Sequence, residues 1–264
     1  MKHQRKKLMA TGLDVVGDTL FGRRLGFSGT PSALLPTGMT CEFEPGSEAR
    51  IIRTLTSPQV VSEMDADLSR WSVHSLLRSF ANADPPFHAL IDTGALITGM
   101  TNEEVAWFLL KEGLSHVRGC VFIDEQGKKM VALRDSGRSI PLSDCGLAWH
   151  ERVTVYDHIH TTGQDIKQPM DARAAVTLSK DMTLRDFAQG CWRMRGLGKG
   201  QTLSLIVIPE VRRLVHEVST TASLPTDVVA WLVVNSIRTE HMQHLQLLRQ
   251  RLTAVWRRRA LGEL

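Results

Sequence analysis

The feature that most constrains the fold is the alternation of short apolar runs with helical patterns between about Phe87 and Pro209. FHALID is apolar almost without interruption, which is typical of a strand buried on both faces of a sheet. GCVFIDE, KMVALRD, RVTVYD, AAVTL and TLSLIVIP are further strand candidates, and TNEEVAWFLLKEG and TLRDFAQGCWRMRG have helical spacing. This order predicts an α/β fold with a mostly parallel sheet of about five to seven strands, flanked by helices.

The pattern divides the chain into three regions. Residues 1–84 are interrupted by Gly and Pro at GFSGTPSALLPTG and EFEPGSE, so we expect an irregular N-terminal arm with one helix, over DADLSRWSVHSLLRSFA. Residues 85–212 form the α/β lobe. Residues 213–264 form a helical C-terminal extension, because the spacing is helical from Pro225 onward. Its apolar stripe consists of Leu245, Leu248, Leu252 and Val255.

Composition favours a globular intracellular protein, cytoplasmic or nuclear. The 264 residues are 42% hydrophobic and 23% charged, which is enough to bury a core. The net charge of +4 comes largely from MKHQRKK and WRRRA near the two ends, a pattern more typical of solvated tails than of a nucleic-acid surface. The four cysteines form no CxxC pair, which favours a reducing compartment and predicts no metal site. No apolar run reaches the ~18 residues of a membrane span, so we expect no membrane partner.

The first segment that could take part in binding or catalysis is TTGQDIK, residues 161–167, just after the strand RVTVYD. Open α/β sheets bind their ligands at the carboxyl ends of the strands. Gly163 lets backbone N–H groups approach an anion closely, and Asp165 can orient a water, a metal or an arginine. Thr162, Gly163, Asp165 and Lys167 are therefore candidate phosphate-binding residues. The alternative is an ordinary turn with a capping Asp that ends the strand.

The second segment is QGCWRMRGLGKGQ, residues 189–201. Arg193 and Arg195 would point about 200° apart on a regular helix, so both can reach one ligand only if the helix ends there. Gly196, Gly198 and Gly200 would provide that end. A guanidinium matches a phosphate bidentately, which makes arginine suited to this role. The candidate contacts are Gln189, Arg193, Arg195, Gly198 and Lys199. The alternative is a helix end whose cations only offset the helix dipole.

In this order the two segments resemble motifs V and VI of the second RecA-like lobe of superfamily 2 helicases. TTGQDIK stands where those enzymes have a Gly-Thr-Asp loop, and QGCWRMRG stands where they have Gln-x-x-Gly-Arg-x-Gly-Arg. Gln164 replaces the usual Thr, and the arginine spacing differs. The resemblance implies half of a nucleotide-driven motor, with ATP and Mg²⁺ bound together with a partner lobe, because no G-x-x-x-x-G-K-[ST] occurs here. Its cations would contact the γ-phosphate or a nucleic-acid strand.

A longer run, from Phe87 to Val211, resembles the C-terminal region of very large eukaryotic proteins catalogued with the ubiquitin thioesterases. Those relatives often carry Cys-x-Arg-Met-Arg followed by Leu-Gly-Lys-Gly, which residues 191–200 match. They often have Arg-Gly-Thr-Asp where this chain has Thr-Gly-Gln-Asp at 162–165. The resemblance implies a piece of a thiol-dependent ubiquitinyl hydrolase, a deubiquitinase that acts on ubiquitinated proteins. Within the larger chain this lobe would have a regulatory or positioning role rather than cleave the substrate, and it would be inactive alone.

Thiol chemistry within the lobe itself would use Cys191. Arg193 and Arg195 could lower its pKa, His158 or His160 on the neighbouring loop could act as base, and Asp157 or Asp165 could orient that base. The alternative, which we favour, is a small buried residue that packs its helix on the sheet. A further alternative for the whole lobe is a degenerate scaffold for protein binding, which Gln164 in place of Thr favours.

Overall fold

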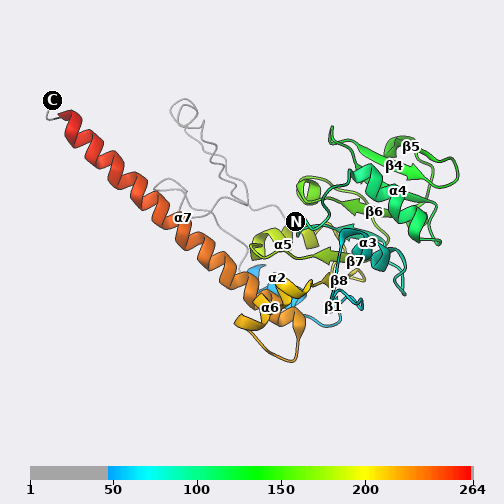
Figure 1. Ribbon diagram of the computed structural model, residues 1–264, viewed down its shortest axis with the longest axis horizontal. Coiled ribbons are helices and arrows are strands. Elements are labelled where there is room, and N and C mark those ends of the chain that lie inside the picture. Colours follow the sequence, from blue (N-terminus) through cyan, green and yellow to red (C-terminus); the bar gives the residue numbers. More distant parts are fainter. Residues whose placement is uncertain (1–46, 263–264) are drawn as a thin grey trace. The chain divides into compact units, whose positions relative to one another are not determined.

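Eight strands form one mixed sheet in residues 47–262, the part of the chain that this computed structural model describes (Figure 1). Across the sheet the order is β1 (Val61–Glu63), β8 (Thr202–Ile206), β7 (Arg173–Thr177), β2 (Ala89–Ile91), β6 (Arg152–Tyr156), β3 (Gly119–Ile123), β4 (Lys129–Leu133) and β5 (Arg138–Pro141). Neighbouring strands from β1 to β3 in this order are parallel, and β4 is antiparallel to both of its neighbours, β3 and β5. The predicted α/β class with a mostly parallel sheet is confirmed.

The sheet has more strands than the about five to seven expected, because two edge strands carry little apolar signal. β5 has no fully buried residue, and β1 buries only Val61. Both are defined by backbone pairing with a neighbour, β4 for the first and β8 for the second. The sequence predicts residues 61–63 to lie in the N-terminal arm, whereas they pair with β8 in the sheet. Residues 1–46 of that arm lie outside the described residues.

Residues Ile52–Leu264 form a compact unit, to which the sheet belongs. Helix α2 (Ser47–Leu55) begins before this unit and ends within it. The predicted helix over DADLSRWSVHSLLRSFA is shorter than expected and begins only at Val73, as α3 (Val73–Ala81). It starts there because Ser72 and Ser75 form a reciprocal capping box, which satisfies the free N–H groups of the first turn.

One face of the sheet is covered by α3 and α4 (Asn102–Glu112). Leu77 and Phe80 of α3 and Leu109 of α4 belong to the same buried cluster as Leu90 and Val155 of the strands. Thr101 caps α4, and its backbone N–H donates a hydrogen bond to the carboxylate of Glu104. Apolar area removed from water stabilises this layer by roughly 25 cal/mol per Å².

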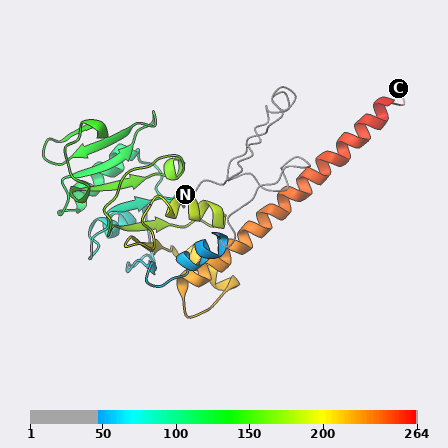
Figure 2. The same cartoon turned by 180° about the vertical axis from the view of Figure 1, so that it is seen from behind.

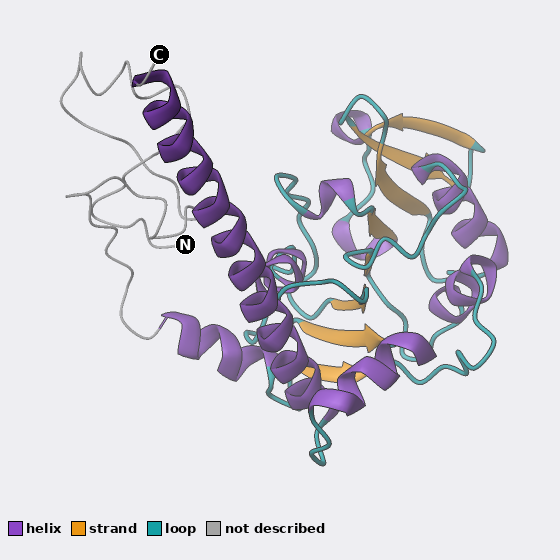
Figure 3. Ribbon diagram, turned by 60° about the vertical axis from the view of Figure 1, so that its left-hand side comes forward, coloured by secondary structure: helices purple, strands orange, loops and turns teal. Residues whose placement is uncertain are grey.

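The opposite face carries α5 (Leu184–Cys191), the loop 157–172 and the first turns of α7 (Leu224–Gly262). Helix α6 (Pro209–Val218) packs on α7. Figure 3 shows the helices flanking the strands. Asn235 of α7 donates to the carbonyl of Met182 at 3.1 Å, just before α5. Short 3-10 turns span Leu142–Asp144, Trp149–Glu151 and Ile159–Thr161. The predicted helical C-terminal extension is therefore confirmed, and it consists of two helices.

Helix α7 has two different halves (Figure 2). Trp231 and Leu232 are buried against the lobe, whereas every side chain from Ile237 to Gly262 is exposed. Among the described residues, no helix is both long enough and apolar enough to cross a bilayer.

The close approach of Gly94 to the backbone of Leu178 can be tested by substitution. A Cβ at Gly94 would lie 2.7 Å from the backbone carbonyl carbon of Leu178, and backbone cannot swing aside. Gly94→Ala should therefore lower the free energy of unfolding by about 1 to 3 kcal/mol. Gly146→Ala is the matched control, because its Cβ meets nothing within 4 Å, and it should stay within about 0.5 kcal/mol of the parent. Urea midpoints measure both; equal midpoints for the two variants would contradict the packing described.

Candidate functional site

The chain leaves the neighbouring strands β2 and β6 in opposite directions. From β2 it runs through α4 to β3, on the far side of β6, and from β6 it runs through the loop 157–172 to β7, on the far side of β2. Diverging connections leave a crevice at the carboxyl ends of the two strands, where open α/β sheets bind ligands. A cavity of about 260 Å³ lies there, and its polar lining residues are Asp92, Thr98, Asn102, Asp157 and His158.

Asp92, directly after β2, fixes one wall of this crevice. Its carboxylate accepts the backbone N–H groups of Leu96 and Ile97, each at 3.0 Å, and the hydroxyl of Thr177 at 2.6 Å. The Thr177 hydroxyl oxygen also accepts the N–H of Gly94 at 2.8 Å. Asp92 is buried, and these donors replace its lost hydration. Sequence reasoning missed this residue, although an acid that ends a buried strand and precedes Thr-Gly was the available signal.

His158, which lines the opposite wall, and His160, which follows it in the chain, make different contacts. His160 Nδ1 lies 2.6 Å from Asp157 Oδ1, and both side chains are largely buried. His158 Nδ1 lies 3.3 Å from the carbonyl oxygen of Thr93. The predicted pairing of a histidine with Asp157 is therefore present for His160. It joins two residues of one turn and does not involve Cys191.

The structure brings the two predicted segments into direct contact. Arg193 Nη1 donates to the carbonyl oxygen of Gln164, and Arg195 Nε donates to Asp165 Oδ1 at 3.1 Å. Both arginines reach the same loop because α5 ends at Cys191, earlier than predicted, so neither lies on a regular helix. From the other side, Lys129 Nζ donates to the carbonyl oxygen of Asp165 at 2.7 Å. Three cations thus hold residues 164 and 165.

Several donors around this loop remain unused within residues 47–262. The backbone N–H groups of Thr162 and Gly163 donate no hydrogen bond, and the Nη1 and Nη2 atoms of Arg195 have no partner. Lys199 is exposed and makes no ion pair in the same range. Gly163 has φ +77°, which turns the backbone in a way that favours glycine, and the space beside its Cα is open. Consecutive free N–H groups of this kind can bind an anion.

Other predicted contact residues lie apart from this group. The ammonium of Lys167 sits 5.6 Å from the ring centre of Trp149. The side chain of Gln189 is exposed, and its carbonyl oxygen accepts Arg193 Nε at 3.4 Å. A Cβ at Gly198 would meet Thr54. In the part of the chain that the structure describes, no three His, Cys, Asp or Glu side chains gather to hold a metal.

Charge and burial distinguish the two arginines. Burial, followed by repulsion from Arg195, lowers the pKa of Arg193 from its ordinary value, although a guanidinium stays protonated at physiological pH. The side chain of Arg195 is 47% exposed and that of Asp165 is 60% exposed. An exposed pair of this kind contributes little to stability, so Arg195 can exchange its partner.

Cys191 does not have the surroundings of a nucleophile. Its side chain is fully buried at the C-terminal end of α5, and burial raises the pKa of its thiol well above the ordinary value. A thiol reacts as the thiolate, which this environment disfavours. The catalytic role considered for Cys191 from the sequence is therefore at odds with its burial, and the packing role fits.

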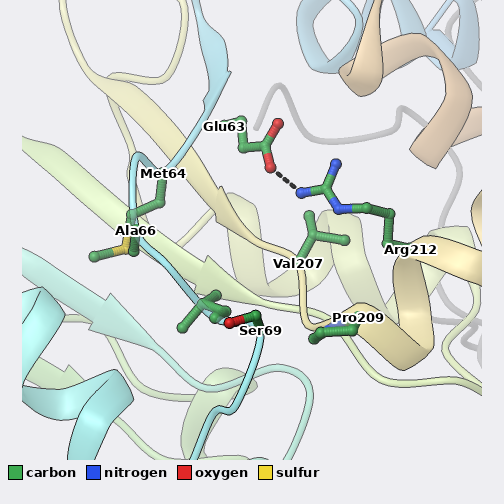
Figure 4. A pocket seen from close by; sticks show the side chains of 8 residues that line it. Glu63, Met64, Ala66, Ser69, Val207, Pro209 and Arg212 are labelled. Atoms are coloured by element: carbon green, nitrogen blue, oxygen red, sulfur yellow. Dashed lines mark hydrogen bonds and ion pairs between the residues drawn. The ribbon is translucent and has the colours of Figure 1, made fainter.

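A second cavity, also of about 260 Å³, lies at the carboxyl ends of β1 and β8. Figure 4 shows the carboxylate of Glu63 facing the guanidinium of Arg212, with which it forms an ion pair. The remaining lining is largely apolar and includes Met64, Leu68 and Val207. The ion pair satisfies the two charges of this cavity, so it has no unpaired charge to attract a ligand. Sequence reasoning did not identify it.

Thiol reactivity tests the burial of Cys191. N-ethylmaleimide at pH 8 should modify the half-buried Cys145 in the native protein and leave Cys191 and Cys120 unmodified, because burial raises the pKa of both thiols. All three should react in 6 M guanidinium. Peptide mass spectrometry locates the label. Fast native labelling of Cys191 would contradict the burial described.

We compared the chain with protein-family models, with curated proteins and with solved structures, and none of them matches it.

Proposed function

We propose that residues 85–212 act as a helicase-type, RecA-like lobe that holds phosphate oxygens at the loop 162–165. One observation supports this proposal above the others. Arg195 is oriented by a single bond from Nε to Asp165, while its two Nη groups and the N–H groups of Thr162 and Gly163 have no partner in the described residues. Oriented donors with unused capacity bind an anion without first losing internal bonds.

The loop and the cations divide the work. Asp165 orients the guanidinium of Arg195, which then offers its outer fork to a phosphate. Arg193 and Lys129 hold the backbone of residues 164 and 165, so that the turn keeps its shape when a phosphate binds. Lys199 adds an exposed positive charge. ATP with Mg²⁺ is the ligand we propose, completed by a partner lobe that carries the phosphate loop missing here.

We propose further that this lobe belongs to a large intracellular thiol hydrolase acting on ubiquitinated proteins. The resemblance of residues 87–211 to the C-terminal region of such proteins supports this assignment. The buried thiol of Cys191 supports a positioning or regulatory role, with the nucleophile supplied by another part of the parent chain.

Phosphate binding is tested by calorimetric titration of the chain with pyrophosphate and with Mg-ATP. Arg195→Ala should weaken binding about 10- to 100-fold, the range expected when a hydrogen bond to a charged group is lost. Arg185→Ala is the matched control, because this exposed arginine lies in the first turn of α5, away from the loop. It should retain parent affinity. Equal losses in both variants, or no binding by the parent chain, would contradict the proposal and favour a protein-binding scaffold.

The thiol assignment is tested in the intact parent protein. Cys191→Ala should leave the rate of ubiquitin-chain cleavage within about twofold of the parent, since a buried packing residue takes no part in bond breaking. Thermal denaturation of the same variant checks that the fold survives the small cavity. A folded variant that has lost cleavage would show that Cys191 is the nucleophile.

A further inference from the structure

The exposed half of α7 carries an apolar face that touches nothing in the described residues. From Ile237 to Gly262 every side chain is exposed, and Trp256 is 69% accessible. Large apolar side chains are normally scattered singly on a surface, so a continuous row needs an explanation. The row, which we call the α7 stripe, consists of Ile237, Met242, Leu245, Leu248, Leu252, Val255 and Trp256.

The members of the α7 stripe share one side of the helix. At about 100° per residue they fall within an arc of about 140°, and Leu247 and Leu261 project elsewhere. The α7 stripe runs from Ile237 to Trp256, roughly 30 Å at 1.5 Å per residue. A straight apolar row of this length and width is the surface that one helix presents to another.

Arginines interrupt the stripe rather than border it. On the same helical projection, Arg238, Arg249 and Arg259 fall inside the apolar arc. The exposed half holds six arginines and one glutamate, and none of these arginines forms an ion pair within the described chain. Any group that covers the stripe must therefore meet guanidinium charges among apolar side chains. Buried charges are stable only when they are paired.

A second copy of the helix cannot supply that pairing. In a parallel pair in register, Arg249 would face Arg249. In an antiparallel pair centred near Leu248, Arg238 would lie beside Arg259. Both arrangements bury like charges, which disfavours association. A lipid surface suits helices whose cations stand at the borders of the apolar face, whereas Arg259 falls near the middle of this one.

We propose that the α7 stripe binds an acidic amphipathic helix, whose apolar face carries Asp or Glu side chains opposite Arg238, Arg249 and Arg259. Apolar contacts provide the association, and the three carboxylate pairs set register and exclude basic or neutral partners. The partner helix belongs to a separate protein. The proposal does not depend on phosphate binding at the loop 162–165.

Fluorescence anisotropy with a labelled synthetic helix tests this surface. The probe is a 26-residue amphipathic peptide with leucine at its heptad a and d positions, except for three glutamates spaced to match the arginines. Its matched control has glutamine at those three places. The acidic probe should bind the chain at least ten times more tightly than the glutamine peptide, and the difference should shrink as salt rises.

Variants on the exposed half locate the contact without disturbing the fold. Arg249→Glu should weaken binding of the acidic probe at least tenfold, and Leu252→Asp should abolish it. Arg251→Glu, just outside the arc, is the control and should change affinity less than threefold. Three results would overturn the proposal: equal binding of the two peptides, equal effects of Arg249→Glu and Arg251→Glu, or a dimer in sedimentation equilibrium that Leu252→Asp dissociates. Binding to phosphatidylserine vesicles with no binding of the acidic probe would overturn it as well.

Discussion

The geometry of the carboxyl edge depends on the buried carboxylate of Asp92. It joins the end of β2 to Thr177 at the end of β7 and to the N–H groups of the turn that follows. A buried charge with several donors is stable, whereas the same donors without it would each lack a partner. Because the turn then leads toward α4, this group holds the segment that joins β2 to that helix.

Much of the fold could be predicted because local signals and long-range packing agree. FHALID has the continuous apolar character of a strand buried on both faces, and Thr101 with Glu104 forms the capping box expected at the start of a helix. β1 and β5 could not be predicted, because pairing with a neighbouring strand, rather than apolar pattern, defines them. Helix α5 ends earlier than the sequence predicts, because the 3-10 turns that follow Cys191 continue a helical spacing.

The site shows a similar division. The glycines after Arg195 indicated a broken helix end, and the structure brings both arginines of that end onto the loop. Sequence analysis allowed for an arginine beside Asp165, which Arg195 provides, but it could not identify the carbonyl oxygen of Gln164 as the acceptor of Arg193, because that requires tertiary contact. It also could not identify Asp92 as a wall of the crevice, because an acid after a strand is common and only its three donors distinguish it.

The crossover from β6 to β7 contains no α-helix. Its path over the sheet is held by side-chain bonds, such as Gln168 to Thr154 and Gln201 to the carbonyl of Pro169. Segments with few backbone bonds of their own open at a lower free energy than the strands they join. The position of this crossover therefore depends on side chains of neighbouring elements rather than on a helix of its own.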